Sequence, residues 1–126
     1  MTSPTAVRTV ARRAVLVAVG GMLGTAARLG LGMLIPDAAL GALCANIVGS
    51  LALGILTARL PASDLRVFLG TGVLGGFTTY SAFAVDSVVM WSSAPLLASL
   101  YVVASIVLGV AAAAAGMRLG RRRVLR

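Results

Sequence analysis

Polar and aromatic residues interrupt one otherwise apolar stretch, Gly70 to Asp86, which reads GTGVLGGFTTYSAFAVD. Hydrocarbon contains no water that would satisfy a freed backbone carbonyl or a hydroxyl group. An irregular polar patch inside a membrane therefore persists only where it faces protein, an ion or an aqueous cavity. This stretch is the leading candidate for a functional site.

The polar chemistry inside the apolar segments is that of hydrogen-bond donors without negative charge. Asn46 lies near the middle of one apolar run, and Tyr101 and Ser105 recur four residues apart in another. Such donors suit an anion better than a cation. Tyr80 and Phe83, spaced i, i+3, share a helix face, and the electropositive edge of a ring can contact a small anion.

Each of these residues also has a purely structural interpretation. Tyr80 and Phe83 could be packing residues. Tyr101 could be an anchor at the membrane interface, and Ser105 could bond back to its own helix.

The elements that must position these residues are membrane spans. The chain has 126 residues, 60% of them hydrophobic and 11% charged, with a mean hydropathy of +1.04. These values exclude a soluble domain of this size. We expect residues 1–126 to form one all-α subunit with four transmembrane helices, at about 14–35, 38–58, 66–90 and 95–117.

The charge distribution indicates a topology. The net charge is +8, from 11 arginines against Asp37, Asp64 and Asp86. Four spans put ten arginines on one side of the membrane, while the two opposite loops have none; the ten are Arg8, Arg12, Arg13, Arg59, Arg66, Arg118, Arg121, Arg122, Arg123 and Arg126. The positive-inside rule then predicts cytoplasmic termini in a multi-pass protein of the cell membrane. Arginines beside apolar spans also argue against nucleic-acid binding.

Several other kinds of chemistry are excluded or disfavoured. The chain has no histidine, and Cys44 is its single cysteine, so an intrachain disulfide, a zinc cluster and His-based catalysis are excluded. We expect no enzyme activity. A small proton-coupled exporter is the alternative of a different class, but it would need an intramembrane carboxylate, and the acidic residues are expected at helix ends.

Four motifs resemble the Fluc (CrcB) family of fluoride channels: GGMLGTAARLG at 20–30, CANIVGSLALG at 44–54, GVLGGFTTYSAF at 72–83 and YVVASIVLG at 101–109. The resemblance covers all four spans. It implies passive efflux of fluoride from the cytoplasm. It also implies an antiparallel dimer of the dual-topology type, two pores between the subunits, a break in the third helix and one structural sodium ion at the dimer interface.

The resemblance also implies roles for individual residues. The backbone carbonyls of Gly75 and Thr78 would hold the sodium ion, and glycines 75 and 76 would let the third span break. Asn46 would donate to fluoride and Phe83 would contact it edge-on. Tyr80, Tyr101 and Ser105 match further pore positions. Arg28 matches a family arginine that would draw anions toward a vestibule, unless it snorkels outward or is structural.

Two positions depart from the family pattern. Tyr80 stands where phenylalanine is common, and Ala82 stands where threonine is usual, so one pore hydroxyl is missing. A non-conducting partner subunit of a heterodimeric fluoride channel is therefore an alternative function.

The arginine bias bears on the partner. Two identical antiparallel chains require insertion in both orientations, which calls for a balanced arginine count. Ten arginines against none favour one orientation and pairing with a paralogous subunit of opposite bias. A homodimer is the competing expectation.

Overall fold

The computed structural model describes residues 4–122, and within that range the chain is almost entirely helical and has no strand. The elements are α1 (Pro4–Leu34), α2 (Ala38–Arg59), α3 (Asp64–Arg66), the π-helix η1 (Val67–Leu74), α4 (Gly75–Phe77), α5 (Tyr80–Ser93) and α6 (Pro95–Arg122). Arg123 and Arg126, two of the arginines in the topology count, lie outside the described residues.

Four helical segments are long and apolar enough to cross a membrane: Pro4–Leu34, Ala38–Arg59, Asp64–Ser93 and Pro95–Arg121. The predicted all-helical, four-span architecture is confirmed. The first helix begins at Pro4, about ten residues before the predicted span, so the polar N-terminal residues from Pro4 onward are also helical.

Local sequence sets the turns between the spans. Asp37 caps α2, its carboxylate accepting a hydrogen bond from Leu40 N at 2.8 Å. Ser63 caps α3, accepting from Arg66 N at 3.3 Å. Pro95 is the first residue of α6, a position where its missing N–H has no helical partner to lose. These are the usual start signals of helices.

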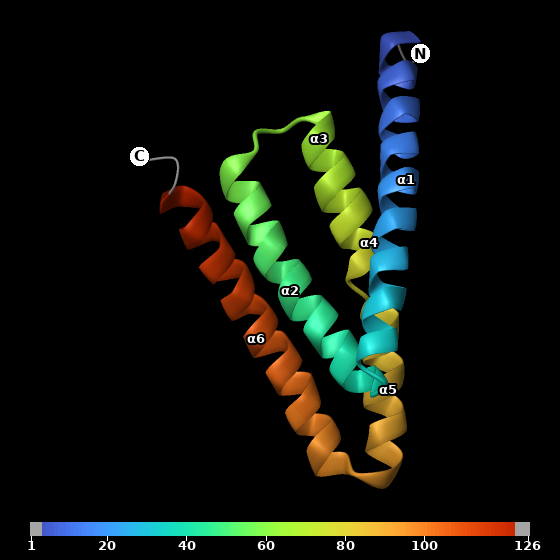
Figure 1. Cartoon of the computed structure of the whole chain (residues 1–126), viewed down its shortest axis with the longest axis vertical. Coiled ribbons are helices and arrows are strands. Elements are labelled where there is room, and N and C mark those ends of the chain that lie inside the picture. Colours follow the sequence, from blue (N-terminus) through green and yellow to red (C-terminus); the bar gives the residue numbers. More distant parts are fainter. Residues whose placement is uncertain (1–3, 123–126) are drawn as a thin grey trace.

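Small residues let the helices pack closely. Helix α6 lies along α2, and α1 lies along η1 and α4 (Figure 1). A methyl group on Gly54 or Gly116 would collide with a backbone carbonyl of the facing helix, and one on Gly24 would collide with the carbonyl of Val73. Helices in lipid associate through such close contacts, since burial from water does not drive them together.

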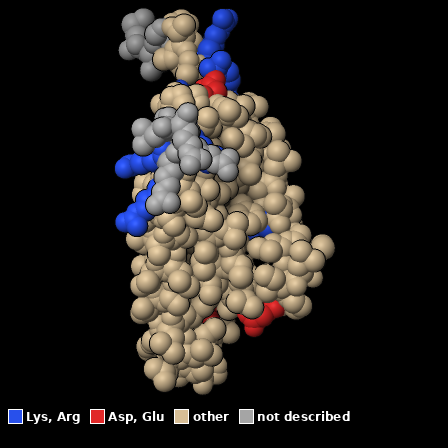
Figure 2. Space-filling view, turned by 60° about the vertical axis from the view of Figure 1, so that its left-hand side comes forward, with Lys and Arg blue, Asp and Glu red and all other residues tan. Residues whose placement is uncertain are grey.

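The outer surface is strongly apolar. Large hydrophobic side chains such as Met33, which is 84% exposed, face outward along the spans. Figure 2 shows basic side chains gathered toward one end of the molecule and a mostly uncharged surface below. The described ends of the chain lie at that end, together with the α2–α3 loop (Figure 1).

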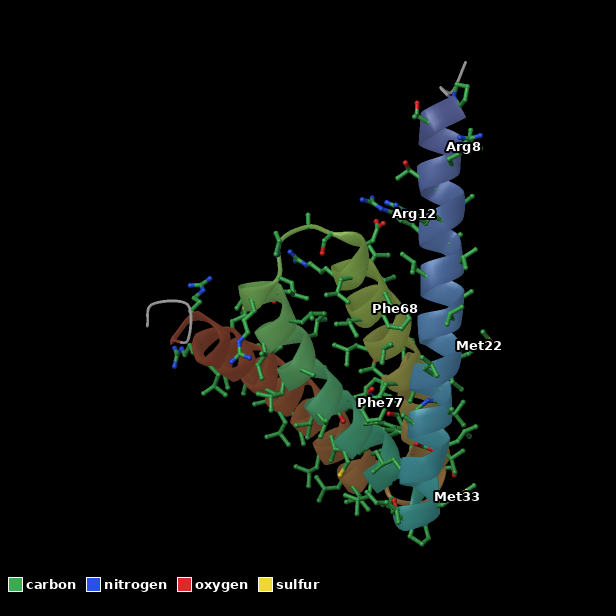
Figure 3. The ribbon with its side chains drawn as sticks, turned by 45° about the horizontal axis from the view of Figure 1, so that its top comes forward. Arg8, Arg12, Met22, Met33, Phe68 and Phe77 are labelled. Atoms are coloured by element: carbon green, nitrogen blue, oxygen red, sulfur yellow. The ribbon has the colours of Figure 1, made fainter. Side chains whose placement is uncertain are left out.

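An ionic contact ties α1 to the start of the third span. Arg12 pairs with one carboxylate oxygen of Asp64, and Arg13 Nε donates to the other at 3.3 Å. Figure 3 shows Arg12 on the side of α1 that faces α3. The contact fixes the basic end of α1 against the α2–α3 loop.

Candidate functional site: the break in the third membrane segment

The third span is interrupted between α4 and α5. Thr78 (φ −78°, ψ 156°) and Thr79 (φ −145°, ψ 121°) are both extended. The predicted break is therefore confirmed, but its position differs from the prediction. Gly75 stays helical at φ −64°, ψ −34°, and Gly76 belongs to α4.

Of the two glycines, Gly76 serves close contact between helices instead. A methyl group on Gly76 would collide with the backbone of Gly21 in α1. Phe77 follows directly and lies between α1 and α2, as Figure 3 shows. The break begins only after this tightly packed turn.

Asn46 of α2 holds the broken segment in place. Its Nδ2 donates to the carbonyl of Thr79 at 3.0 Å, and its Oδ1 accepts from Thr79 N at 2.8 Å. One side-chain amide thus satisfies both polar groups of an extended residue, as a neighbouring strand would. An amide nitrogen carries two hydrogens, so a second N–H of Asn46 is available for a ligand.

The break also redirects donors away from two carbonyls. In a continuous helix, Thr79 N would donate to the carbonyl of Gly75, but here it donates to Asn46 Oδ1. Likewise Ala82 N would donate to the carbonyl of Thr78, but it donates to Thr79 Oγ1 at 3.2 Å. These two carbonyls, of Gly75 and Thr78, are the ones expected from the family resemblance to hold sodium.

Arg28 does not extend toward the membrane surface. It is half-buried, and its Nε donates to the carbonyl of Gly76 at 3.4 Å. Thr25 Oγ1 donates to the same carbonyl at 3.4 Å. The snorkelling expectation for Arg28 is wrong, because the break leaves a carbonyl without its helical donor within reach of the guanidinium group. Arg28 supports the site from the α1 side.

Three aromatic rings form a row beside the break. The centroids of Tyr80 and Phe83 are 5.9 Å apart, and those of Phe83 and Tyr101 are 5.7 Å apart. Tyr80 is 80% exposed on the face of the subunit, whereas Tyr101 is only 9% exposed. Tyr101 is therefore a buried member of the site. Its hydroxyl oxygen is buried and makes no hydrogen bond with the described part of the chain.

Ser105 lies one turn further along α6. Its hydroxyl donates to the carbonyl of Tyr101 at 2.7 Å, so in this conformation it bonds back to its own helix. Of the predicted site residues, Asn46, Gly75, Thr78, Tyr80 and Phe83 are brought together at the break. Tyr101 adjoins Phe83, while Ser105 and Arg28 lie to either side.

Two small cavities lie between these groups. One of about 210 Å³ is lined by Asn46, Ser50, Gly75 and Thr78, among others. Its neighbour, about 260 Å³, is lined by Asn46, Thr78, Thr79, Tyr80 and Phe83. A small ion in either would meet amide and hydroxyl groups, and in the second cavity it would also meet aromatic rings. Neither lining includes a carboxylate.

One polar residue near the site, Asp86, was not among the predicted site residues. Asp86 was expected at a helix end, but it lies in the interior of α5, and one of its carboxylate oxygens is buried without a partner among the described residues. The signal was present in the sequence, since Asp86 follows Phe83 by less than one turn.

Comparison with known proteins identifies the family of this chain. The family model described as "CrcB-like protein, Camphor Resistance (CrcB)" matches residues 15–117. The chain belongs to the CrcB family. The match includes every residue of the break and of the aromatic row. It also weighs against the exporter alternative, although Asp86 supplies the kind of carboxylate that such a protein would need.

Similar relatives are named fluoride-specific ion channels. "Fluoride-specific ion channel FluC" of Paracoccus denitrificans is 48% identical over 113 residues, covering 83% of this chain and 91% of the relative. The protein of that name from Agrobacterium fabrum is 44% identical over 117 residues, covering 84% and 94%. "Fluoride-specific ion channel FluC 2" of Bacillus subtilis is 43% identical over 112 residues, covering 82% and 84%.

Proposed function

We propose that this chain is a subunit of a fluoride-specific ion channel, through which fluoride leaves the cytoplasm passively, reducing its toxicity. The observation that carries the proposal is the similarity to the Paracoccus denitrificans protein named a fluoride-specific ion channel, 48% identical over 113 residues. The geometry supports it, because Asn46, Thr78 and Phe83 line one small cavity. No covalent step is involved.

Selectivity would come from replacing the water shell of fluoride in a narrow passage. The free N–H of Asn46 would donate to the ion, and the edges of Phe83 and Tyr80 would face it without adding a charge. The unpartnered hydroxyl of Tyr101 would be the next donor along the route. Larger anions such as chloride would fit this set of contacts less well.

The two freed carbonyls fit a structural sodium ion. Gly75 and Thr78 would direct their carbonyl oxygens to it, and the same pair from a second subunit would complete the shell. Gly75 is exposed, and a methyl group built on it would meet only one atom within 4 Å, the carbonyl oxygen of Gly70 at 3.8 Å. Bound there, sodium would join two subunits electrostatically and would not be transported.

A second subunit is required, because the site lies open on one face of this one. The arginine bias favours cytoplasmic termini and a paralogous partner of opposite orientation, and the numbered name of the Bacillus subtilis relative agrees with paired copies. Reporter proteins fused to the C-terminus test this. We expect signal only from the cytoplasmic side; equal populations on both sides would support an antiparallel homodimer instead.

Fluoride efflux from liposomes tests the proposed function directly. We expect a purified channel, made from this chain with or without a paralogue, to release trapped fluoride rapidly and chloride very slowly. Chloride flux as fast as fluoride flux would contradict the proposal.

A non-conducting partner subunit is the second candidate function. Two observations favour it: the hydroxyl of Tyr80 adds bulk beside the cavity, and Ala82 leaves out a hydroxyl. Tyr80→Phe with Ala82→Thr would distinguish the two. The accessory function is correct if the wild-type chain conducts no fluoride through its own groove, whichever partner it is paired with, while the Tyr80→Phe/Ala82→Thr variant does conduct.

A further inference from the structure

A third cavity opens at the basic end of the bundle. It measures about 380 Å³ and lies between α1, the end of α2, the α2–α3 loop and η1. Its polar lining consists of two guanidinium groups and three hydroxyl groups, from Arg13, Arg66, Thr57, Ser63 and Thr71. The function derived above does not use these residues.

This cavity is joined to the site at the break. Leu53 and Gly70 line both it and the 210 Å³ cavity, which in turn shares Asn46 and Thr78 with the 260 Å³ cavity beside the rings. The three cavities therefore adjoin one another in a row, which we call the groove, from the basic end of the subunit to the aromatic row. We call the 380 Å³ cavity the mouth of this groove.

The mouth carries a net positive charge. Asp64 is the acidic residue beside it, and that carboxylate is already bound by both Arg12 and Arg13. Arg66 Nη1 donates to the carbonyl of Leu60 at 3.3 Å, which holds its charge at the cavity. Three arginines beside one aspartate attract anions from solution, and a recess with low-dielectric walls strengthens that attraction.

We propose that this mouth is where fluoride enters the groove from the basic side, with Arg13 and Arg66 collecting the anion. The proposal rests on the proposed function. The arginines raise the local fluoride concentration without holding the ion tightly. The hydroxyls of Ser63, Thr57 and Thr71 then offer hydrogen bonds at the point where the ion begins to lose water. Leu53 and Gly70 form the junction through which it passes toward Asn46.

Removing charge at the mouth tests the electrostatic part. Fluoride efflux is measured in vesicles of neutral phosphatidylcholine at about 10 mM salt, where charges act over about 30 Å, and at about 1 M, where they act over about 3 Å. For Arg13→Gln and Arg66→Gln we expect the ratio of low-salt to high-salt rate to fall about two- to ten-fold. Arg121→Gln, which removes an equal charge from an exposed position on α6, is the matched control.

This ratio is taken within each variant, so a loss of folded protein cancels. Arg66→Lys keeps the charge and loses guanidinium geometry; Arg66→Gln keeps a donor for Leu60 and loses the charge. We expect Arg66→Lys to retain the wild-type ratio. An equal fall for Arg121→Gln, or an effect of the mouth variants only after anionic phosphatidylglycerol is added, would overturn the proposal, the latter indicating a lipid headgroup site.

Changing the junction tests the route itself. Leu53 is 42% exposed, so its size can change with little cost to folding. We expect Leu53→Phe to slow fluoride efflux several-fold and Leu53→Ala to leave it unchanged or faster. Leu40→Phe, at an exposed position of α2 that lines none of the three cavities, is the control. Equal rates for Leu53→Phe and wild type would overturn the route.

Different results would contradict the proposed channel function and the proposed entry route. If wild-type protein conducts no fluoride in any pairing, the proposed function is wrong, and the entry route that rests on it is wrong as well. If wild-type protein conducts and the mouth and junction variants match their controls, fluoride enters elsewhere and the function stands.

Discussion

At the scale of single residues, Asn46 has one role that its contacts show and one that we propose. Its amide holds the extended Thr79 by two hydrogen bonds, of 3.0 and 2.8 Å. We propose that its second N–H binds the anion. A substitution that affects these two roles differently distinguishes a structural effect from an effect on conduction.

Asn46→Asp should mainly reduce fluoride efflux, whereas Asn46→Ala should mainly reduce stability. Aspartate keeps the acceptor for Thr79 N but faces the Thr79 carbonyl and the incoming anion with negative charge, so we expect fluoride efflux to fall at least ten-fold. Alanine leaves both backbone groups of Thr79 unpaired, at a cost of about 1–3 kcal/mol for each buried group. Thermal unfolding in detergent and liposome efflux measure the two effects. Wild-type flux in Asn46→Asp would contradict the assignment.

Phe83 should matter through its ring edge. Phe83→Ile keeps much of the volume and removes the aromatic quadrupole, worth about 1 kcal/mol per contact, so we expect a several-fold or larger loss of fluoride flux. Phe68→Ile is the matched control, since Phe68 lies in η1 and lines neither cavity at the break. Liposome efflux measures both, and equal losses would indicate that only packing is involved.

At the scale of elements, the third membrane segment works because its two halves are held differently. The η1–α4 half packs against α1 through glycines, and the α5 half contacts α6 and α2. Between them, Asn46 satisfies both backbone groups of Thr79, Thr78 N donates to the carbonyl of Leu74, and the Thr79 side chain accepts from Ala82 N at the start of α5. Irregular backbone at membrane depth is stable only under such conditions.

Gly76→Ala should loosen this arrangement. The added methyl group would meet the backbone of Gly21, which cannot move aside cheaply, so we expect a loss of about 1–3 kcal/mol in the free energy of unfolding and a lower flux. Gly30→Ala is the control, because nothing lies within 4 Å of a methyl group there. The shift in thermal unfolding temperature measures the difference. Similar shifts in the two variants would argue against the close α1–α4 contact.

At the scale of the whole molecule, we propose that the subunit is half of a functional unit. The groove runs along one open face, and the exposed Tyr80 and Gly75 lie on the subunit surface beside it. A second subunit covering that face would close the groove into a pore and bring two pairs of freed carbonyls together.

Sodium should therefore govern conduction through its effect on assembly. We expect protein purified and assayed with sodium replaced by N-methyl-D-glucamine to lose fluoride flux and dimer content together, since the large organic cation cannot fit between carbonyls. Size-exclusion chromatography and liposome efflux in parallel measure this. Full flux and an unchanged dimer without sodium would contradict the proposed ion site.

The sequence by itself determined that this protein lies in a membrane and how many times it crosses it. Apolar composition and span length do not depend on how helices pack, so four membrane helices could be predicted from them. Asn46 and the aromatic pair were identifiable as well, because a polar or irregular group in hydrocarbon needs a partner wherever it lies. The family motifs agreed with this pattern.

The tertiary structure alone decided how those residues meet. The break falls at Thr78–Thr79 and not at the glycines, because its position depends on where Asn46 of α2 can reach the backbone. Arg28 turns inward for the same reason, since a carbonyl freed by the break lies within its reach. The groove toward Arg13 and Arg66 joins residues more than fifty positions apart in the sequence, and spacing along one chain does not encode which helices become neighbours.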